Sequence, residues 1–197
     1  MNYLILDCAY QPTAILVDGN KQDILALDTN NSDTYMQLID QLLKQNGLTI
    51  DNIQNIAINV GPGSFTGLRV AISIAKGLGF GSNINFYTFN SFDYAKSDKV
   101  IVCQGFSNFV YVKQGDNMSC ETIDSLHNAH KYITTSNIIF EQLKEYNLDV
   151  ELVEKKDYFS IISDNLTSKS HINQLEPLYL RKSQAEIQRE AKVGKNG

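Results

Sequence analysis

Short apolar runs separated by polar turns open the chain. Residues 3–6 are apolar and end at Asp7, residues 13–17 are apolar and β-prone, and residues 24–27 form a third such run. Asp18 and Gly19, between the second and third runs, are typical of a tight turn. The pattern predicts three strands in an antiparallel meander, with the Asp7 carboxylate at the end of the first strand.

Helical periodicity follows these strands. Ser32 is a suitable N-cap, and Asp33 suits the positive end of a helix. Gly47 is expected to end the helix, so the pattern predicts a first helix over residues 32–46. The apolar residues at helical spacing are Tyr35, Met36, Leu38, Ile39, Leu42 and Leu43.

A strand, a loop, a helix and a further strand complete the first half. Residues 56–60 are apolar and run into a glycine-rich loop, residues 65–80 have the pattern of a second helix, and residues 84–87 are the next strand candidate. The predicted order is β-β-β-α-β-α-β, an α/β domain over residues 1–95.

The second half has weaker signals. We expect a smaller second α/β lobe over residues 96–182 and a polar tail that frays over residues 183–197. The candidate elements are paired strands at 100–103 and 109–112, a helix at 138–146, a charged segment with at most a short strand at 151–157, and an extended apolar segment at 177–181.

The loop before the second helix is a candidate functional motif, called here the signature loop. Ser64 can cap the helix, and free N–H groups at a helix N-terminus can hold an anion. A dinucleotide fingerprint would need its third glycine one position before Gly67, and a Walker A loop would need Lys and Ser or Thr in place of Leu68 and Arg69. A tight capped turn and an anion site both remain open. The motif residues are Gly61, Pro62, Gly63, Ser64, Phe65, Thr66, Gly67 and Arg69.

Small residues recur along the second predicted helix. Such rows at a spacing of four let another backbone come close, and i±4 ridges pack into grooves. The backbone that packs against these rows belongs either to the core of the same domain or to another protein, and the pattern leaves both possibilities open. One row is Gly67, Ala71, Ala75 and Gly79, a second is Ser73, Gly77 and Gly81, and an apolar ridge of Val70, Ile74 and Leu78 runs between them.

Composition narrows the classes of function. The formal net charge is −5 and the pI is about 5.1, which argues against a protein that grips nucleic acid through phosphate contacts of its own. The three cysteines are widely spaced, as in proteins of a reducing compartment. We find no leader or membrane-spanning pattern, so a soluble, cytoplasmic protein is expected.

Candidate metal ligands and nucleophiles are few. His127 and His130 form an H-x-x-H pair that a helix would place on one side, but two ligands are too few for a metal site. His171 is isolated and expected at the surface. Cys8 could be a nucleophile in principle, but a small buried residue is the stronger expectation. We therefore expect no catalytic residues, no metal and no cofactor.

Residues 61–79 resemble the characteristic sequence of the TsaB (YeaZ) family. Residues 4–7 resemble the opening strand of that family, residues 32–43 its first helix, and residues 177–181 its closing segment. The resemblance is strong over residues 1–90 and implies an actin-like fold (ASKHA, ribonuclease H-like) with a reduced second lobe.

The chain also departs from the family pattern. Cys8 and Ala9 replace the usual Thr-Ser after the first Asp, and Asn31 stands where many members carry His. Gln104, followed by Gly and Phe, stands where the second domain usually has Asp-Ala-Arg. A ligand role for these positions is therefore not expected.

The resemblance implies an accessory, non-catalytic role. Such a subunit forms a heterodimer with a related actin-like protein, TsaD, which transfers threonylcarbamoyl to tRNA adenosine. A small ATPase, TsaE, joins the cycle, and this chain would meet tRNA only indirectly. The first two helices would contact TsaD, and the interface residues expected are Tyr35, Met36, Ile39, Leu42, Leu43, Val70, Ala71, Ser73, Ile74, Ala75 and Gly77.

Two alternatives stay open. The chain could be an enzyme acting alone, either an actin-like nucleotide hydrolase or a glycoprotease-type hydrolase. The single Asp7 and the missing second phosphate loop argue against that alternative. It could also be a homodimeric binding protein that buries the same helix faces.

Overall fold

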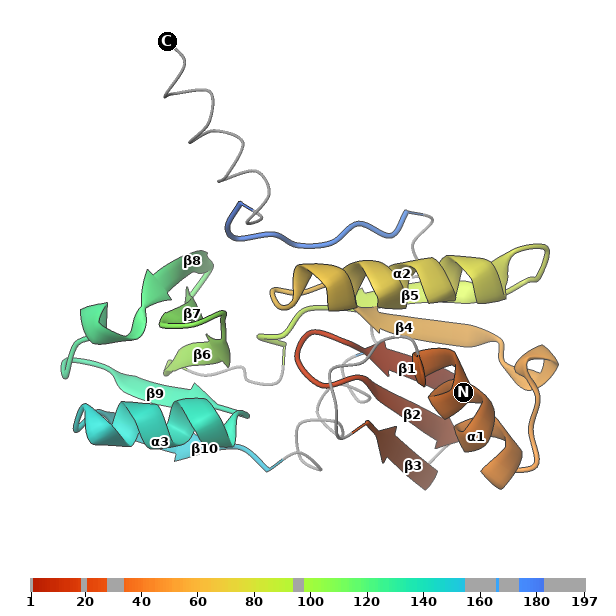
Figure 1. Ribbon diagram of the computed structural model, residues 1–197, viewed down its shortest axis with the longest axis horizontal. Coiled ribbons are helices and arrows are strands. Elements are labelled where there is room, and N and C mark those ends of the chain that lie inside the picture. Colours follow the sequence, from red (N-terminus) through yellow and green to blue (C-terminus); the bar gives the residue numbers. More distant parts are fainter. Residues whose placement is uncertain are drawn as a thin grey trace, which may run out of the picture.

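The chain forms two lobes side by side, each built on a five-stranded sheet (Figure 1). The computed structural model describes residues 2–18, 21–27, 34–93, 98–154, 166 and 174–182. The predicted boundary at residues 95 and 96 and the predicted tail at residues 183–197 lie outside the described residues.

The sheet of the first lobe has the order β3-β2-β1-β4-β5. Strands β1, β2 and β3 are antiparallel, whereas β4 pairs in parallel with both β1 and β5. The predicted meander and the two later strands are thus confirmed. The strands are β1 (Asn2–Asp7), β2 (Thr13–Asp18), β3 (Lys21–Ala26), β4 (Asn55–Asn59) and β5 (Asn85–Phe89).

Two helices, α1 (Tyr35–Gln45) and α2 (Phe65–Gly79), pack with one face of this sheet into a single core; a 3-10 turn, η2 (Ile50–Asn52), precedes β4. Side chains alternate along a strand, so Leu4 and Leu6 of β1 face these helices while Tyr3 and Ile5 face the opposite side. The helix-side core explains the apolar periodicity of both helices.

Two expected details of the first helix have different outcomes. The N-cap position is occupied by Thr34, so the prediction of Ser32 as N-cap is wrong; Ser32 and Asp33 lie outside the described residues. The helix ends as predicted, because Gly47 follows the C-cap with a φ of +67°, a conformation that glycine adopts without strain.

The sheet of the second lobe has the order β10-β9-β6-β7-β8. The predicted hairpin at 100–103 and 109–112 is confirmed as β6 and β7, and the predicted helix as α3. Strands β8 and β9 were not expected. The elements are β6 (Val100–Gln104), β7 (Phe109–Gln114), β8 (Asn117–Thr122), η3 (Ile123–Ser125), β9 (Lys131–Thr134), α3 (Asn137–Glu145) and β10 (Asp149–Leu152).

A shared apolar core joins the lobes. Tyr3 and Ile5 on the side of β1 away from the helices belong to the same cluster as Cys103 and Tyr111 of the second lobe, and Phe92 at the junction is fully buried. The lobes are therefore packed against one another and not merely linked by chain.

Residues 174–182 form an extended segment without regular secondary structure. In Figure 1 this segment is blue and runs beside α2 toward the second lobe. Leu175 is buried in the helix-side core, and Leu180 packs on the core shared by the lobes. The predicted extended segment at 177–181 is thus confirmed.

Candidate functional site

The signature loop connects β4 to α2, and Ser64 caps the helix as predicted. Its Oγ accepts a hydrogen bond from the Gly67 N–H at 3.2 Å, which satisfies one of the free donors of the first turn. The Gly61 N–H donates to Oδ1 of Asn59 at 2.8 Å. The loop is thus held by hydrogen bonds from the strand before it and the helix after it.

The glycines of this loop are explained by close approach of the chain's own backbone. A Cβ on Gly63 would lie 2.6 Å from the Ala9 carbonyl oxygen, and one on Gly61 would lie 2.7 Å from the Leu178 carbonyl oxygen. A Cβ on Gly67 would collide with the Cys8 carbonyl oxygen. Main chain occupies the space above all three glycines, which favours the tight capped turn over a phosphate cradle.

Asp7 is the centre of a buried hydrogen-bond network. Its Oδ1 accepts the Ala9 N–H at 2.9 Å and the side-chain amide of Asn59 at 3.1 Å. The same amide donates to Ser91 Oγ at 3.0 Å, and Ser91 Oγ donates to the Pro62 carbonyl at 2.8 Å. The Asp7 carboxylate therefore ties the ends of β1 and β4 to the signature loop.

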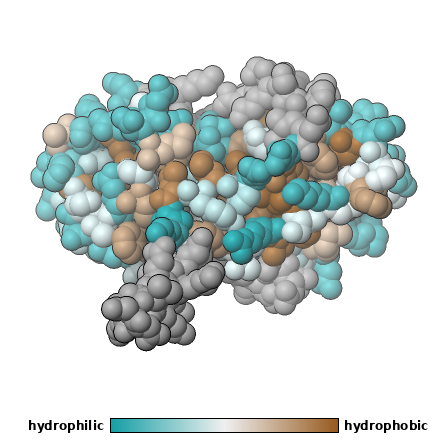
Figure 2. Space-filling view, turned by 90° about the horizontal axis from the view of Figure 1, so that it is seen from above, coloured by the Kyte–Doolittle hydropathy of each residue, from teal (hydrophilic) through white to brown (hydrophobic). Residues whose placement is uncertain are grey.

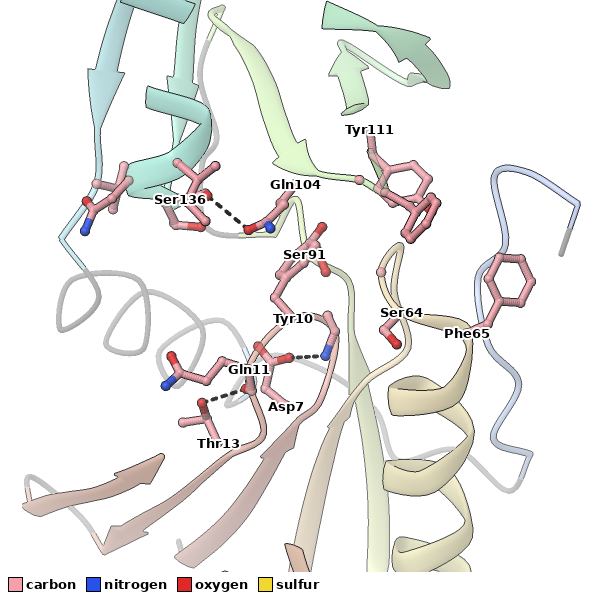
Figure 3. Close-up of a pocket in the computed structure, with 18 of the residues that line it drawn as sticks. Asp7, Tyr10, Gln11, Thr13, Ser64, Phe65, Ser91, Gln104, Tyr111 and Ser136 are labelled. Carbon is pink, nitrogen blue, oxygen red and sulfur yellow. Dashed lines mark hydrogen bonds between the residues drawn. The ribbon is translucent and has the colours of Figure 1, made fainter. Parts of the chain in front are cut away.

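A cleft of about 1120 Å³ lies between the lobes, and Asp7 is at its base (Figure 3). Tyr10 and Gln11 enter it from the turn after β1, Ser64 and Phe65 from the start of α2, and residues of β6, β7 and α3 from the second lobe. Charged lining residues among those described are Asp7, Glu154 and Arg181. The remaining polar lining consists of hydroxyl, amide and backbone groups.

Sequence reasoning missed most of this cleft. Ser136 Oγ donates to Oε1 of Gln104 at 3.2 Å, which joins the start of α3 to the end of β6 on the wall formed by the second lobe. Ser136 also caps α3, with its Oγ accepting the Ile139 N–H at 3.3 Å. A polar residue followed by an apolar helix is a cap signal that the sequence does contain.

The cysteines near the cleft are unsuited to nucleophilic chemistry. Cys8 and Cys103 are both buried. Burial, reinforced by the charge of Asp7, raises the pKa of the Cys8 thiol to about 12. Burial also raises the pKa of the Cys103 thiol far above its ordinary value. Because the thiolate is the reactive form, these thiols are chemically inert near neutral pH.

The H-x-x-H pair lies in a loop before β9, so the idea that a helix aligns its two rings is wrong. The backbone N–H of His127 donates to the Tyr132 hydroxyl at 3.0 Å, and that hydroxyl donates to the backbone carbonyl of His127 at 2.8 Å. Throughout the described part of the chain, no three His, Cys, Asp or Glu side chains gather as a metal would require. His171 lies outside the described residues.

The two helices divide the expected interface residues into inner and outer positions. Tyr35, Ile39, Leu42, Leu43, Ala71 and Ala75 are buried in the helix-side core. The expectation that Ala71 and Ala75 admit a second protein is therefore wrong, because the sheet of their own lobe fills that space. On α1, Met36 is 45% exposed.

The other expected positions on α2 are at least partly exposed, although Val70 and Ile74 also pack against the helix-side core. Ser73 and Gly77 are exposed, and Val70 and Ile74 are half-buried. Among the described residues, a Cβ on Gly77 would meet nothing within 4 Å. We define the outer face of α2 by the residues Arg69, Val70, Ser73, Ile74, Lys76 and Gly77.

The two-lobe arrangement and the strand orders define an actin-like α/β protein. A YeaZ structure from Pseudomonas aeruginosa covers 91% of this chain and 99% of its own, with a TM-score of 0.69 and 15% identity. A second protein of that organism, described as similar to peptidase YeaZ, has a TM-score of 0.70 at 16% identity, with the same coverage of 91% and 99%. Within this class, the chain is most usefully compared with YeaZ (TsaB) proteins, whose fold it shares.

Sequence comparisons agree with that relationship. TsaB of Haemophilus influenzae, a tRNA threonylcarbamoyladenosine biosynthesis protein, is 38% identical over 72 residues, which are 36% of this chain and 30% of that protein. TsaB of Buchnera aphidicola is 35% identical over 72 residues, 36% of this chain and 33% of that protein. The chain thus spans about a third of the length of these curated relatives.

Two further matches extend the comparison. Residues 26–101 match the family model for TsaD, tRNA N6-adenosine threonylcarbamoyltransferase. The uncharacterized protein MG208 of Mycoplasma genitalium is 27% identical over 195 residues, 90% of this chain and 94% of that protein.

In the described ranges, no helix is long and apolar enough to cross a membrane.

Proposed function

We propose that the chain is a non-catalytic scaffold subunit that dimerises with a TsaD-like protein and supports threonylcarbamoyl transfer to adenosine 37 of tRNA. The observation that carries this proposal is the outer face of α2, where the small residues Ser73 and Gly77 are exposed beside the half-buried Val70 and Ile74. Curated relatives named for this pathway, and the match of residues 26–101 to TsaD, support a pair of related subunits.

The outer face of α2 has the physical character of a docking surface. Ser73 and Gly77 let a neighbouring helix approach closely, while Val70 and Ile74 provide apolar contact. Seen from above, apolar surface lies among polar residues on this side of the molecule (Figure 2). A related helix pair laid against α1 and α2 would form a four-helix arrangement.

Charge favours a partner with an acidic rim. Between Asp51 and Asp93 the chain contains no acidic residue, although its formal net charge is −5. Arg69 and Lys76 lie on the outer face of α2 and are exposed. Complementary charge would speed association and orient the partner.

An accessory role suits the cleft. Asp7 is engaged in structural hydrogen bonds with Ala9 and Asn59, and the signature loop is filled by main chain. We propose that catalysis belongs to the partner, that a TsaE-like ATPase joins the complex, and that tRNA is held mainly by other subunits. The location proposed is the cytoplasm, where tRNA is modified.

The test uses variants that enlarge side chains on the outer face of α2. Ser73→Trp and Gly77→Leu should each weaken binding of purified TsaD about fivefold or more, because added volume at a packed contact costs about 1–3 kcal/mol. The matched control is Glu141→Leu, a bulky change at an exposed position of α3 in the other lobe. Isothermal titration gives the affinities.

Folding must be separated from docking in this test. No described atom lies within 4 Å of a Cβ at Gly77, and leucine has the higher helix propensity, so Gly77→Leu should melt no lower than the unchanged chain. Full affinity for TsaD in folded Ser73→Trp and Gly77→Leu variants would overturn the proposed surface. Sedimentation of the chain alone tests the alternative that a second copy covers the same face.

A further inference from the structure

Residues 174–182 contact both lobes within a short stretch of chain. On the first lobe, Leu175 is 3% exposed in the helix-side core, and the Leu178 N–H donates to the Val60 carbonyl at 2.6 Å. The Leu178 carbonyl lies over Gly61, in the space that a Cβ would need. This half of the segment is therefore fixed to the signature loop.

Tyr179 then contacts the first turn of α2. Its ring stacks on Phe65, with centroids 4.4 Å apart and planes 15° apart. Nε of Arg69 donates to the Tyr179 hydroxyl at 2.9 Å, and the guanidinium lies 5.7 Å from the centre of the ring. Arg69 is also part of the outer face of α2, so Tyr179 orients a residue of the proposed docking surface.

Arg181 contacts the second lobe. Its guanidinium carbon lies 5.7 Å from the ring centre of Phe106 and 5.5 Å from that of Phe109, on the β6–β7 hairpin. Phe106, Arg181 and Phe65 all line the interlobe cleft. The two anchors, Tyr179 and Arg181, are thus attached to opposite lobes, and each contacts an aromatic residue that lines the cleft.

The chain between these anchors has little slack. Two residues of extended chain span about 7 Å, and Leu180 between them packs on the core shared by the lobes. A movement of the β6–β7 hairpin relative to α2 must therefore displace Tyr179, Arg181 or both.

We propose that residues 174–182 are an interlobe strap that couples the outer face of α2 to the rim of the cleft. A protein that docks on α2 and fixes Arg69 thereby restrains the cleft, and a change in the cleft alters the docking surface by the same coupling free energy. The identity of that docking protein rests on the proposed function, whereas the coupling is a property of the chain alone.

The experiment measures backbone amide exchange by NMR on the full chain without any partner. Tyr179→Ala removes a contact to the first lobe, yet exchange of the Phe109 and Val110 amides in the second lobe should become about two- to fivefold faster, the loss expected for one exposed cation–π contact. Reciprocally, Arg181→Ala should speed exchange of the Leu68 and Arg69 amides in α2.

The control variant is Glu176→Ala, because Glu176 is an exposed residue of the strap whose carboxylate bonds to Gln174. It should leave exchange in both lobes unchanged. If Tyr179→Ala destabilises the fold, Tyr179→Phe keeps the ring stack and removes only the hydroxyl bond to Arg69, and should give a smaller effect in the same amides.

Two outcomes decide the matter. Faster exchange across the lobe boundary in both directions supports the strap, and changes confined to the lobe that lost its own contact overturn it. Binding of TsaD to the unchanged chain is measured separately. Faster amide exchange in the opposite lobe, together with no binding of TsaD, would support the strap and contradict the proposed function. Binding of TsaD, together with unchanged amide exchange in the opposite lobe, would support the proposed function and contradict the strap.

Discussion

The Cys8 carbonyl oxygen lies in the space that a Cβ on Gly67 would occupy. The backbone at the start of α2 therefore lies against the backbone of the turn after β1. Gly77, ten residues further along the same helix, has no described atom within 4 Å of the corresponding position. One helix thus contains a glycine required by packing and another for which the described part of the chain offers no packing reason.

Opposite changes in stability are expected at these two glycines. Gly77→Ala should raise the free energy of unfolding by about 1 kcal/mol, because alanine favours a helix interior over glycine. Gly67→Ala should lower it by about 1–3 kcal/mol, since the added methyl group must displace backbone. Urea denaturation of both variants gives the values; a stabilising Gly67→Ala would contradict the close approach to Cys8.

Asp7→Ala should destabilise the chain without removing a catalytic activity. The change leaves the buried Ala9 N–H and Asn59 amide without this acceptor, at a cost of about 1–3 kcal/mol. Asp51→Ala, at an exposed position, is the control for loss of charge. ATP hydrolysis by the isolated unchanged chain should be negligible; robust turnover abolished by Asp7→Ala would make the chain an enzyme.

Stability should fall as the pH rises from about 9 to 12. Burial raises the pKa of Cys8 from 9.0 to about 12, so the unfolded state releases this proton at a pH where the folded state still holds it. The free energy of unfolding should therefore decrease with pH in this window, by up to about 1.4 kcal/mol per unit for this group. Urea titrations of unchanged chain and Cys8→Ala should show a shallower decline in the variant.

Chelation should leave folding unchanged. His127 and His130 lie in a loop, where the His127 backbone is bonded to the Tyr132 hydroxyl. The described residues hold no set of metal ligands that could stabilise the fold. Thermal melts with and without EDTA should superpose, and a large fall in melting temperature would reveal a structural metal.

The first lobe was predictable because β1, β2 and β4 are apolar and buried along most of their length, and each helix buries one face. Strand β8 was missed because Asn117–Thr122 has no buried residue and therefore no apolar alternation. Strand β9 was missed because Lys131–Thr134 is only four residues long and follows a polar loop. Periodicity reports burial, so a short or solvated strand leaves little trace in it.

The site was less predictable for a different reason. A small-residue row predicts close approach but not the identity of the neighbour, and Ala71 and Ala75 turned out to face their own sheet. The cleft assembles Tyr10, Gln104 and Ser136 from segments far apart in the chain, and no spacing rule connects them. Of the described lining residues, Asp7 at a strand end and Ser64 at a helix cap were placed from the sequence.

The packing of the signature loop also bears on how the motif should be used in recognising relatives. Its glycines are required because the backbone of Ala9, Cys8 and Leu178 lies too close for a Cβ, so selection for folding alone would preserve them. A descendant that had lost its partner, or gained a different one, would still display the motif. Its presence in a genome is evidence of shared ancestry and architecture, and evidence of a shared role must be sought on the outward surface of the helix that follows.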